Sequence, residues 1–127
     1  MAGYTEPVLR LYSSDPHVDL TSAAVKHTWT LPASGWGSRI HIKHFGFVLD
    51  VEAMSSNATD PVIALEVDDV EIATKTLTDG SALGTELRAT MDEFDVAAGQ
   101  KIELVVKTAA TTDGEGHLFI DYQVIPA

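Results

Sequence analysis

The feature of this sequence that most limits its fold is an alternation of apolar and polar residues with a period of two. Successive side chains of a strand point to opposite faces of a sheet, so this period gives each strand one apolar face. The clearest alternating segments are residues 45–53, 63–67, 70–72, 94–106 and 118–124. Weaker strand patterns occupy residues 8–12 and 25–31. Turn residues separate these segments, and the sequence therefore predicts an all-β, antiparallel β-sandwich.

The length of the chain indicates a single domain. Its 127 residues, 45% of them hydrophobic, are enough to enclose one core. We expect a short N-terminal docking arm or edge strand over residues 1–12 and a single β-sandwich domain over residues 13–127. The first dozen residues are too apolar for a free tail, so we expect them to dock on this domain or on a neighbour.

The clearest hairpin prediction covers residues 62–77. A two-residue turn through the Asp-Asp pair at 68 and 69 makes Val67 face Val70. The same pairing makes Leu65 face Ile72, so both apolar sets lie on one side of the sheet. Asp-Asp is a poorer turn pair than Asn-Gly, but the agreement of the two apolar patterns supports the hairpin.

A change of phase predicts a β-bulge. Ile40 and Ile42 are apolar at even positions, whereas residues 45–53 are apolar at odd ones. A strand changes face in this way when one extra residue is inserted, and we expect the insertion near residues 44–46, where Gly46 eases it. Before that point the opposite face carries the one basic stripe of the sequence, which consists of Arg39, His41 and Lys43.

Residues 81–91 fit either a helix or a strand. Leu83, Leu87 and Met91 lie four residues apart, which is a helical spacing, and they follow an Asp-Gly-Ser sequence. The surrounding chain favours strands, so both alternatives stay open for this segment.

Charge and composition exclude several classes of function. The chain has 8 Lys and Arg against 19 Asp and Glu, a net charge of −11. Affinity for a phosphate backbone comes from cationic side chains, so neither nucleic acid nor an anionic membrane is expected as a partner. The absence of cysteine excludes disulfides, cysteine-based zinc sites and thiol nucleophiles. No apolar run is long enough for a transmembrane helix.

The charge is divided unevenly along the chain. Residues 1–47 carry a net charge of +1 and residues 48–127 carry −12. This asymmetry indicates either an interaction surface in the first part or an acidic surface that keeps the domain in solution. The first seven residues have neither a basic start nor an apolar core, so we expect no secretory signal and synthesis in a cytoplasm. Without export, the Asn-Ala-Thr sequon at Asn57 is interpreted as a chance match.

No catalytic motif is present, and we expect no enzyme activity, no cofactor and no metal. His41 and His44 resemble a metal pair, but residues three apart on a strand point to opposite faces unless a bulge turns one ring. The loop at residues 113–117 holds two carboxylates and two glycines but lacks the ligand spacing of an EF-hand. Solvated turns are the simpler interpretation of such acidic loops.

Aromatic and apolar residues near the N-terminus are the better candidates for a function. Trp36 lies in a glycine-rich loop, where its ring either anchors a partner or covers one end of the sandwich. Trp29 alternates with polar neighbours and is assigned to the core. The predicted partner-contacting residues are Tyr4, Val8, Leu9, Leu11, Tyr12, Trp36, Arg39, His41 and Lys43.

Two segments carry a resemblance to a known group of proteins. Residues 94–106 form a short strand, an Ala-Gly turn and a longer Val- and Ile-rich strand, and residues 118–124 form a last strand close to the C-terminus. Together they resemble the small jelly-roll decoration (cement) proteins of tailed bacteriophage capsids. Carbohydrate-binding modules and tumour-necrosis-factor-like trimers share this arrangement of strands, and the resemblance transfers no functional residue.

The resemblance implies a non-enzymatic structural protein of a virion. Such a protein is made in the host cytoplasm, binds the major capsid protein on the outer surface of the shell, and stabilises contacts between capsid subunits. A homo-oligomer, either a trimer or a dimer, is compatible with this role. The alternative function is a carbohydrate-binding module or receptor-binding tip that uses Trp36.

Overall fold

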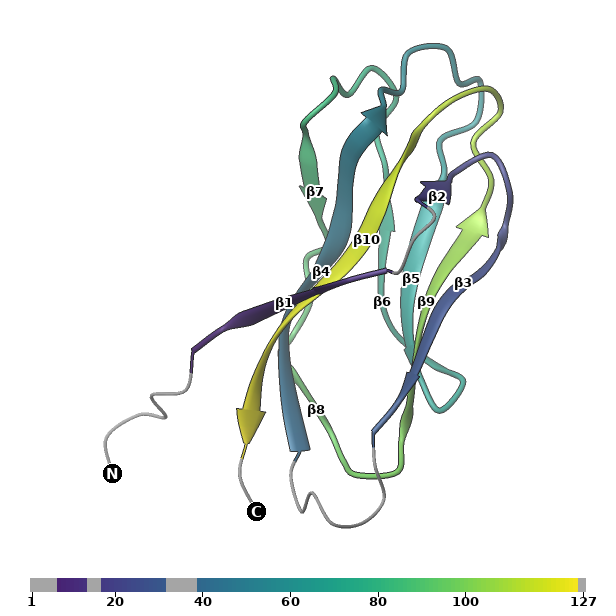
Figure 1. Cartoon of the computed structure of the whole chain (residues 1–127). Coiled ribbons are helices and arrows are strands. Elements are labelled where there is room, and N and C mark those ends of the chain that lie inside the picture. Colours follow the sequence, from purple (N-terminus) through teal and green to yellow (C-terminus); the bar gives the residue numbers. More distant parts are fainter. Residues whose placement is uncertain (1–6, 14–16, 32–38, 126–127) are drawn as a thin grey trace.

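The chain folds into two antiparallel β-sheets that pack against each other (Figure 1). The computed structural model describes residues 7–13, 17–31 and 39–125, and within these ranges it contains strands and no helix. The described strands, in chain order, are β1 Leu9–Tyr12, β2 Val18–Asp19, β3 Ala24–Thr30, β4 Arg39–Glu52, β5 Val62–Val67, β6 Val70–Thr76, β7 Glu86–Arg88, β8 Phe94–Val96, β9 Lys101–Thr108 and β10 Glu115–Ile125. The predicted antiparallel β-sandwich is confirmed.

The connections between the sheets are those of a jelly roll. One sheet has the order β1-β10-β4-β7, with β2 also on β10 and β8 also on β4, and the other has the order β3-β9-β5-β6. The chain passes back and forth between the two, because β3, the β5–β6 hairpin and β9 alternate with strands of the larger sheet. β8 pairs with the first part of β4 and β7 with its middle, and together they fill one position at the edge. This topology makes β1 and β3 edge strands of the two sheets.

The core lies between the inner faces of the two sheets. Phe45, Phe47 and Leu49 of β4 are fully buried and face the equally buried Leu65 of β5 and Leu104 of β9. Burial of each such side chain contributes about 1.5–3 kcal/mol relative to leaving it in water. The period-two pattern seen in the sequence is therefore what holds the two layers together.

The predicted bulge in β4 is present and lies one residue earlier than expected. Ile42 pairs with Tyr122 and His44 pairs with Asp121, so Lys43 is the extra residue. Ile42 and Phe45 consequently both face the core even though one is at an even and the other at an odd position. The apolar face ends sooner than the pattern indicates, because Val51 is 42% exposed near the end of the strand.

The predicted hairpin at residues 62–77 is confirmed, but one of its pairings is wrong. Val67 pairs with Val70 as expected. Leu65, however, pairs with Ala73 and not with Ile72, because a register shift between Leu65 and Glu66 leaves Ile72 without a partner on β5. The shift turns the small Ala73 into the core, where it is 7% exposed.

Residues 81–91 are not helical. They form a turn followed by the three-residue strand β7, in which Leu87 pairs with Phe47. Leu83 is 60% exposed, so the helical spacing of the three apolar residues does not correspond to a buried face.

Candidate docking surface

An apolar groove opens between the two sheets near the edge strands β1 and β3. It encloses about 170 Å³. Its lining residues come from five strands and one adjoining loop position: Leu11, Trp29, Thr30, Leu31, Ile40, Ile102, Ile120 and Tyr122. A cavity of roughly 150 Å³ with apolar walls accepts a benzene ring, so the groove has room for one leucine- or phenylalanine-sized side chain.

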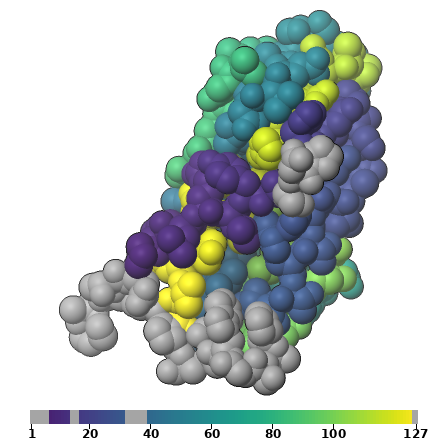
Figure 2. Space-filling view, in the orientation of Figure 1, coloured from purple at the N-terminus to yellow at the C-terminus, as the bar shows by residue number. Residues whose placement is uncertain are grey.

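Exposed apolar side chains lie on β1, the strand that supplies Leu11 to this groove, and on the residue before it. Val8 is 50% exposed, Leu9 43% and Tyr12 48%. The other large apolar side chains that are exposed among the described residues are Val25, Val51, Val70 and Leu83, which lie on separate strands and loops. In Figure 2 the purple atoms of β1 lie at the molecular surface beside the yellow atoms of β10. The β1 edge is therefore the place where exposed apolar residues are consecutive.

An ion network holds β1 on the sheet. Arg10 donates from Nε and Nη2 to the two carboxylate oxygens of Asp121, at 2.6 and 3.0 Å, and from Nη1 to Glu86 at 2.5 Å. Asp121 is only 5% exposed, and the Arg10 guanidinium lies 3.8 Å from the ring centre of Phe119. The Asp121 carboxylate raises the pKa of Arg10, with a further contribution from Glu86. The guanidinium therefore connects β1, β10 and β7.

Close packing on the outer face of the sheet supports this network. Phe119 is fully buried although its side chain points away from the core, and its ring lies against Gly46 of β4. A Cβ atom at Gly46 would come within 2.2 Å of the Leu87 carbonyl oxygen and 2.9 Å of the Phe119 ring. Glycine is required at this position by the close approach of two neighbouring strands.

The basic stripe on β4 is neutralised by acids from β8 and the residue just before it. His41 lies 2.5 Å from both Asp95 and Glu93, which contact opposite ring nitrogens. Lys43 lies 3.5 Å from Glu93, and Arg39 lies 3.9 Å from Asp95. Hydrogen bonds to Asp95 and then to Glu93 raise the pKa of His41. Arg39, His41 and Lys43 share one face, as the pattern indicates, but that face carries balanced charge.

The two histidines that resembled a metal pair contact different carboxylates. His44 lies 3.2 Å from Asp121, whereas the two ring nitrogens of His41 are engaged by Asp95 of β8 and by Glu93 just before it. The loop that raised the possibility of calcium is also occupied by its own contacts. Asp113 accepts hydrogen bonds from the Ser55 amide and hydroxyl and from Asn57.

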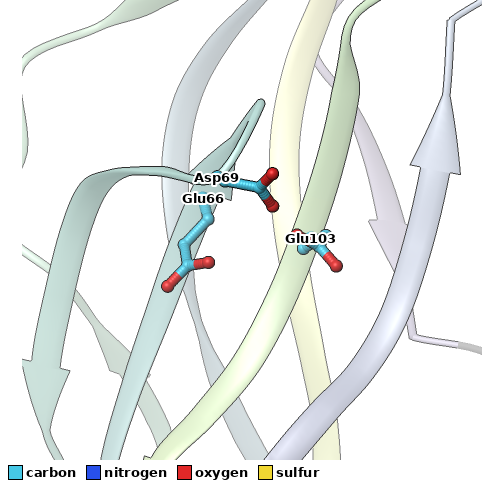
Figure 3. Close-up of side chains that lie close together, drawn as sticks. All are labelled: Glu66, Asp69 and Glu103. Atoms are coloured by element: carbon cyan, nitrogen blue, oxygen red, sulfur yellow. The ribbon is translucent and has the colours of Figure 1, made fainter.

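One group of three acids in the described part of the chain has carboxylate oxygens within 4.8 Å of one another. Glu66 and Asp69 come from the β5–β6 hairpin and Glu103 comes from β9 (Figure 3). Lys101 lies 3.0 Å from Asp69 and 3.4 Å from Glu103, and Lys107 lies 3.0 Å from Glu66. The two lysines supply the positive charge that these carboxylates need.

A second hollow, of about 210 Å³, is lined by Tyr12, Ser13, Asp50 and His117. His117 lies 2.9 Å from both carboxylate oxygens of Asp50. The Ser13 hydroxyl is buried and accepts a hydrogen bond from the Leu118 amide at 3.1 Å. Its contact with the main chain indicates a structural role for this serine.

The predicted partner-contacting residues fall into three groups. Val8, Leu9 and Tyr12 are exposed at the β1 edge, and Leu11 lines the groove. Arg39, His41 and Lys43 lie on the outer face of β4. Tyr4 and Trp36 lie outside the described residues. Trp29 packs against the core as expected and also forms part of the groove wall.

Sequence reasoning missed the residues that fix β1 to the sheet. Asp121 is the one acid inside the apolar run 118–124, and that isolated charge was the available signal. Its partner Arg10 is 111 residues away in the chain, and Glu86, the second partner of Arg10, is 76 residues from that arginine, so no local pattern connects them.

Comparison with known proteins does not assign this chain to a family. No family model matches it, and no curated protein matches its sequence. Within the described residues there is no helix of the length and hydropathy needed to cross a membrane.

Proposed function

We propose that this chain is a non-enzymatic capsid decoration protein that binds the outer surface of a bacteriophage shell and stabilises contacts between capsid subunits. The observation that carries the proposal is the apolar groove beside the exposed residues of β1. Leu11 of β1 lines an opening with room for one apolar side chain, and Val8 and Leu9, which precede it in the chain, are exposed. An anchor residue seated in a pocket is how many interfaces gain most of their affinity. The occupant is an apolar side chain of the major capsid protein.

The charge of the molecule supports an outer position on the shell. A net charge of −11 opposes contact with packaged DNA, whereas it is compatible with a surface that faces solvent. The jelly-roll topology supports the same role, because capsid and lectin domains are common uses of this fold. The virion location and synthesis in the host cytoplasm are part of the proposal.

The experiment is density-gradient sedimentation of native-source lysate, with the protein followed by mass spectrometry. Co-migration with megadalton particles that survives moderate salt supports the proposal. Recovery at the top of the gradient contradicts it and favours the alternative, a carbohydrate-binding module or receptor-binding tip. A glycan panel then tests that alternative, for which the exposed Tyr12 ring beside Asp50 and His117 is the described candidate site.

A point variant tests the docking surface better than removal of the N-terminal segment. Deletion of residues 1–12 would leave the buried Asp121 without Arg10, and loss of one partner of a buried pair costs about 3–5 kcal/mol. Leu9→Asp places a charge on β1 two residues before the groove-lining Leu11, and Leu83→Asp places the same charge at an exposed loop position. We expect Leu9→Asp to reduce particle binding at least tenfold and Leu83→Asp to leave it unchanged. Wild-type binding by Leu9→Asp would show that the groove is not the docking surface.

A further inference from the structure

The four sheet edges of the described structure differ in how they resist addition of another strand. β3 carries a bulge at Lys26, and β6 carries one at Ile72. β7 and β8 are three residues long each. Bulges, charged residues and short length are the usual features that prevent edge-to-edge pairing. Three of the four edge positions therefore have recognised protection.

β1 is also short, with four residues, but it has no bulge. Its four residues pair with β10 in an unbroken register, from Leu9 opposite Tyr122 to Tyr12 opposite Phe119. Its one charged side chain, Arg10, lies over the sheet against Asp121 and Phe119. Leu9 and Tyr12 are both more than two-fifths exposed. β1 is a regular edge with apolar side chains.

The register identifies the main-chain groups that face outward. The Ser13 amide donates to the Leu118 carbonyl oxygen at 2.8 Å, so this pair is hydrogen-bonded. Hydrogen-bonded and non-hydrogen-bonded pairs alternate along an antiparallel ladder, so the main-chain groups of Leu11 also point toward β10. Those of Arg10 and Tyr12 point away from it, toward the free edge.

We propose that β1 is a self-association edge, at which β1 of a second copy of this chain pairs antiparallel to it about a twofold axis. In the pairing that we infer, Arg10 of one copy is hydrogen-bonded opposite Tyr12 of the other, and the two Leu11 residues face each other on the axis. Main-chain bonds at Arg10 and Tyr12 then continue the six-stranded sheet into the second copy. A twofold interface uses the same patch twice, and this strand is complementary to itself.

Charge and side-chain chemistry favour this register and this occupant. A pairing with Arg10 opposite Arg10 places like charges side by side, which is unfavourable. The proposed register instead sets each guanidinium next to a tyrosine ring, a contact of the kind that Arg10 already makes with Phe119. Leu11 lines the groove, so the second leucine extends the apolar wall.

The net charge of the chain does not prevent this contact. Asp121 and Glu86 neutralise Arg10, and the other residues of β1 are uncharged. At physiological salt, charges beyond about 8 Å are largely screened, so the acidic residues elsewhere contribute little repulsion at this edge. The inference is independent of capsid decoration, since it concerns the protein alone in solution.

The test uses the absence of cysteine in the chain, because Leu11→Cys then carries a single thiol. Residues opposite each other in a non-hydrogen-bonded pair have Cα atoms about 4.5 Å apart, which is within reach of a disulfide. We expect Leu11→Cys to form a covalent dimer under mild oxidation at least tenfold faster than Val25→Cys. Val25 is 48% exposed on β3 and is the matched control.

Sedimentation equilibrium of the wild-type chain provides a second, independent measurement. We expect a mass twice the 13.6 kDa of one chain at high concentration, and a monomer for Tyr12→Pro, which removes an outward amide and leaves the β1–β10 bonds intact. Tyr12→Phe should keep the dimer. A wild-type monomer at every soluble concentration overturns the proposal, as does a dimer that is insensitive to Tyr12→Pro. Loss of particle binding by Tyr12→Pro in a monomeric protein would assign the edge to a strand of the capsid subunit instead.

Discussion

At the scale of single residues, Asn57 makes more hydrogen bonds that join separate loops than any other described side chain. Its amide nitrogen donates to the carboxylates of Asp79 and Asp113 and to the Asp113 carbonyl, at 3.0–3.1 Å. Its oxygen accepts from the amides of Thr112 and Asp113, at 2.7 and 3.0 Å. The donors and acceptor of the Asn57 side-chain amide are therefore engaged in hydrogen bonds within the fold, although this residue is also the first of a glycosylation sequon.

We predict that Asn57→Ala lowers the free energy of unfolding by about 2 kcal/mol, because several partly buried polar groups lose their partner. Urea denaturation followed by tryptophan fluorescence measures this change. Thr59→Ala is the control, since it destroys the same sequon while Thr59 contacts Thr111 through its main-chain amide. Equal stability of the two variants would contradict a structural role for Asn57.

At the scale of elements, the turn of the β5–β6 hairpin is held in a conformation that glycine adopts more readily. Asp68 and Asp69 have φ angles of 49° and 65°, which are unfavourable for residues with a Cβ atom. Asp68 has a compensating role, because its carboxylate accepts from the Lys101 amide at 2.9 Å and from Gln100 at 3.1 Å. Asp69 makes an exposed ion pair with Lys101, and pairs of that kind contribute little.

We predict that Asp69→Gly raises the free energy of unfolding by about 1 kcal/mol, since it removes the strain and loses only a surface contact. Asp68→Gly relieves similar strain but also removes the two hydrogen bonds to β9 and its turn, so it should not be stabilising. Midpoints of urea denaturation compare the two variants. A stabilised Asp68→Gly, or an Asp69→Gly below wild type, would contradict this account of the turn.

The strands themselves were predictable from sequence, whereas their bulges were only partly so. Alternation marked β4, β5, β9 and β10 because each has one face in the core. The phase change before Phe45 revealed the bulge in β4, since it moved large apolar residues from even to odd positions. No such change marks the bulge at Ile72, because Ala73 is too small to stand out as a core residue. A register shift that brings only a small residue into the core leaves no clear change in the apolar pattern of the sequence.

At the scale of the whole molecule, the candidate docking surface was less predictable than the fold. The groove joins side chains from β1, β3, β4, β9 and β10, which are distant in sequence and meet only because the jelly-roll topology places their strands together. Composition indicated that Leu9 and Leu11 dock somewhere, and Leu11 lines the groove. The acids that neutralise the basic stripe lie in or next to a three-residue strand, fifty or more positions away in the chain. Partner contacts stay predictions for the described residues of this surface as well as for Tyr4 and Trp36.

The dependence of overall stability on pH combines opposite contributions from the two sheets. On the larger sheet, Asp95 and Glu93 raise the pKa of His41 above the value of about 6.5 that histidine has in an unfolded chain. The resulting contribution of His41 to the free energy of unfolding is complete below about pH 6.5 and is lost as pH rises through the folded-state pKa. On the smaller sheet, burial lowers the pKa of His27. Its contribution is complete above the unfolded-state value and is lost as pH falls.

We therefore predict that His41→Gln and His27→Gln change the pH profile of stability in opposite directions. In the wild type, the His41 contribution to stability is lost as pH rises above about 6.5, and His41→Gln should abolish that loss. The His27 contribution is lost as pH falls below about 6.5, and His27→Gln should abolish that loss. Urea denaturation at a series of pH values from mildly acidic to mildly alkaline measures both profiles against wild type. Glu93→Gln is the control for the cause of the raised His41 pKa, because it removes the charge of one of the two acids that contact His41. It should reproduce part of the effect of His41→Gln at higher pH and leave the His27-dependent change at lower pH unaltered. Parallel profiles for the two histidine variants would contradict the assignment of these contributions to separate sheets.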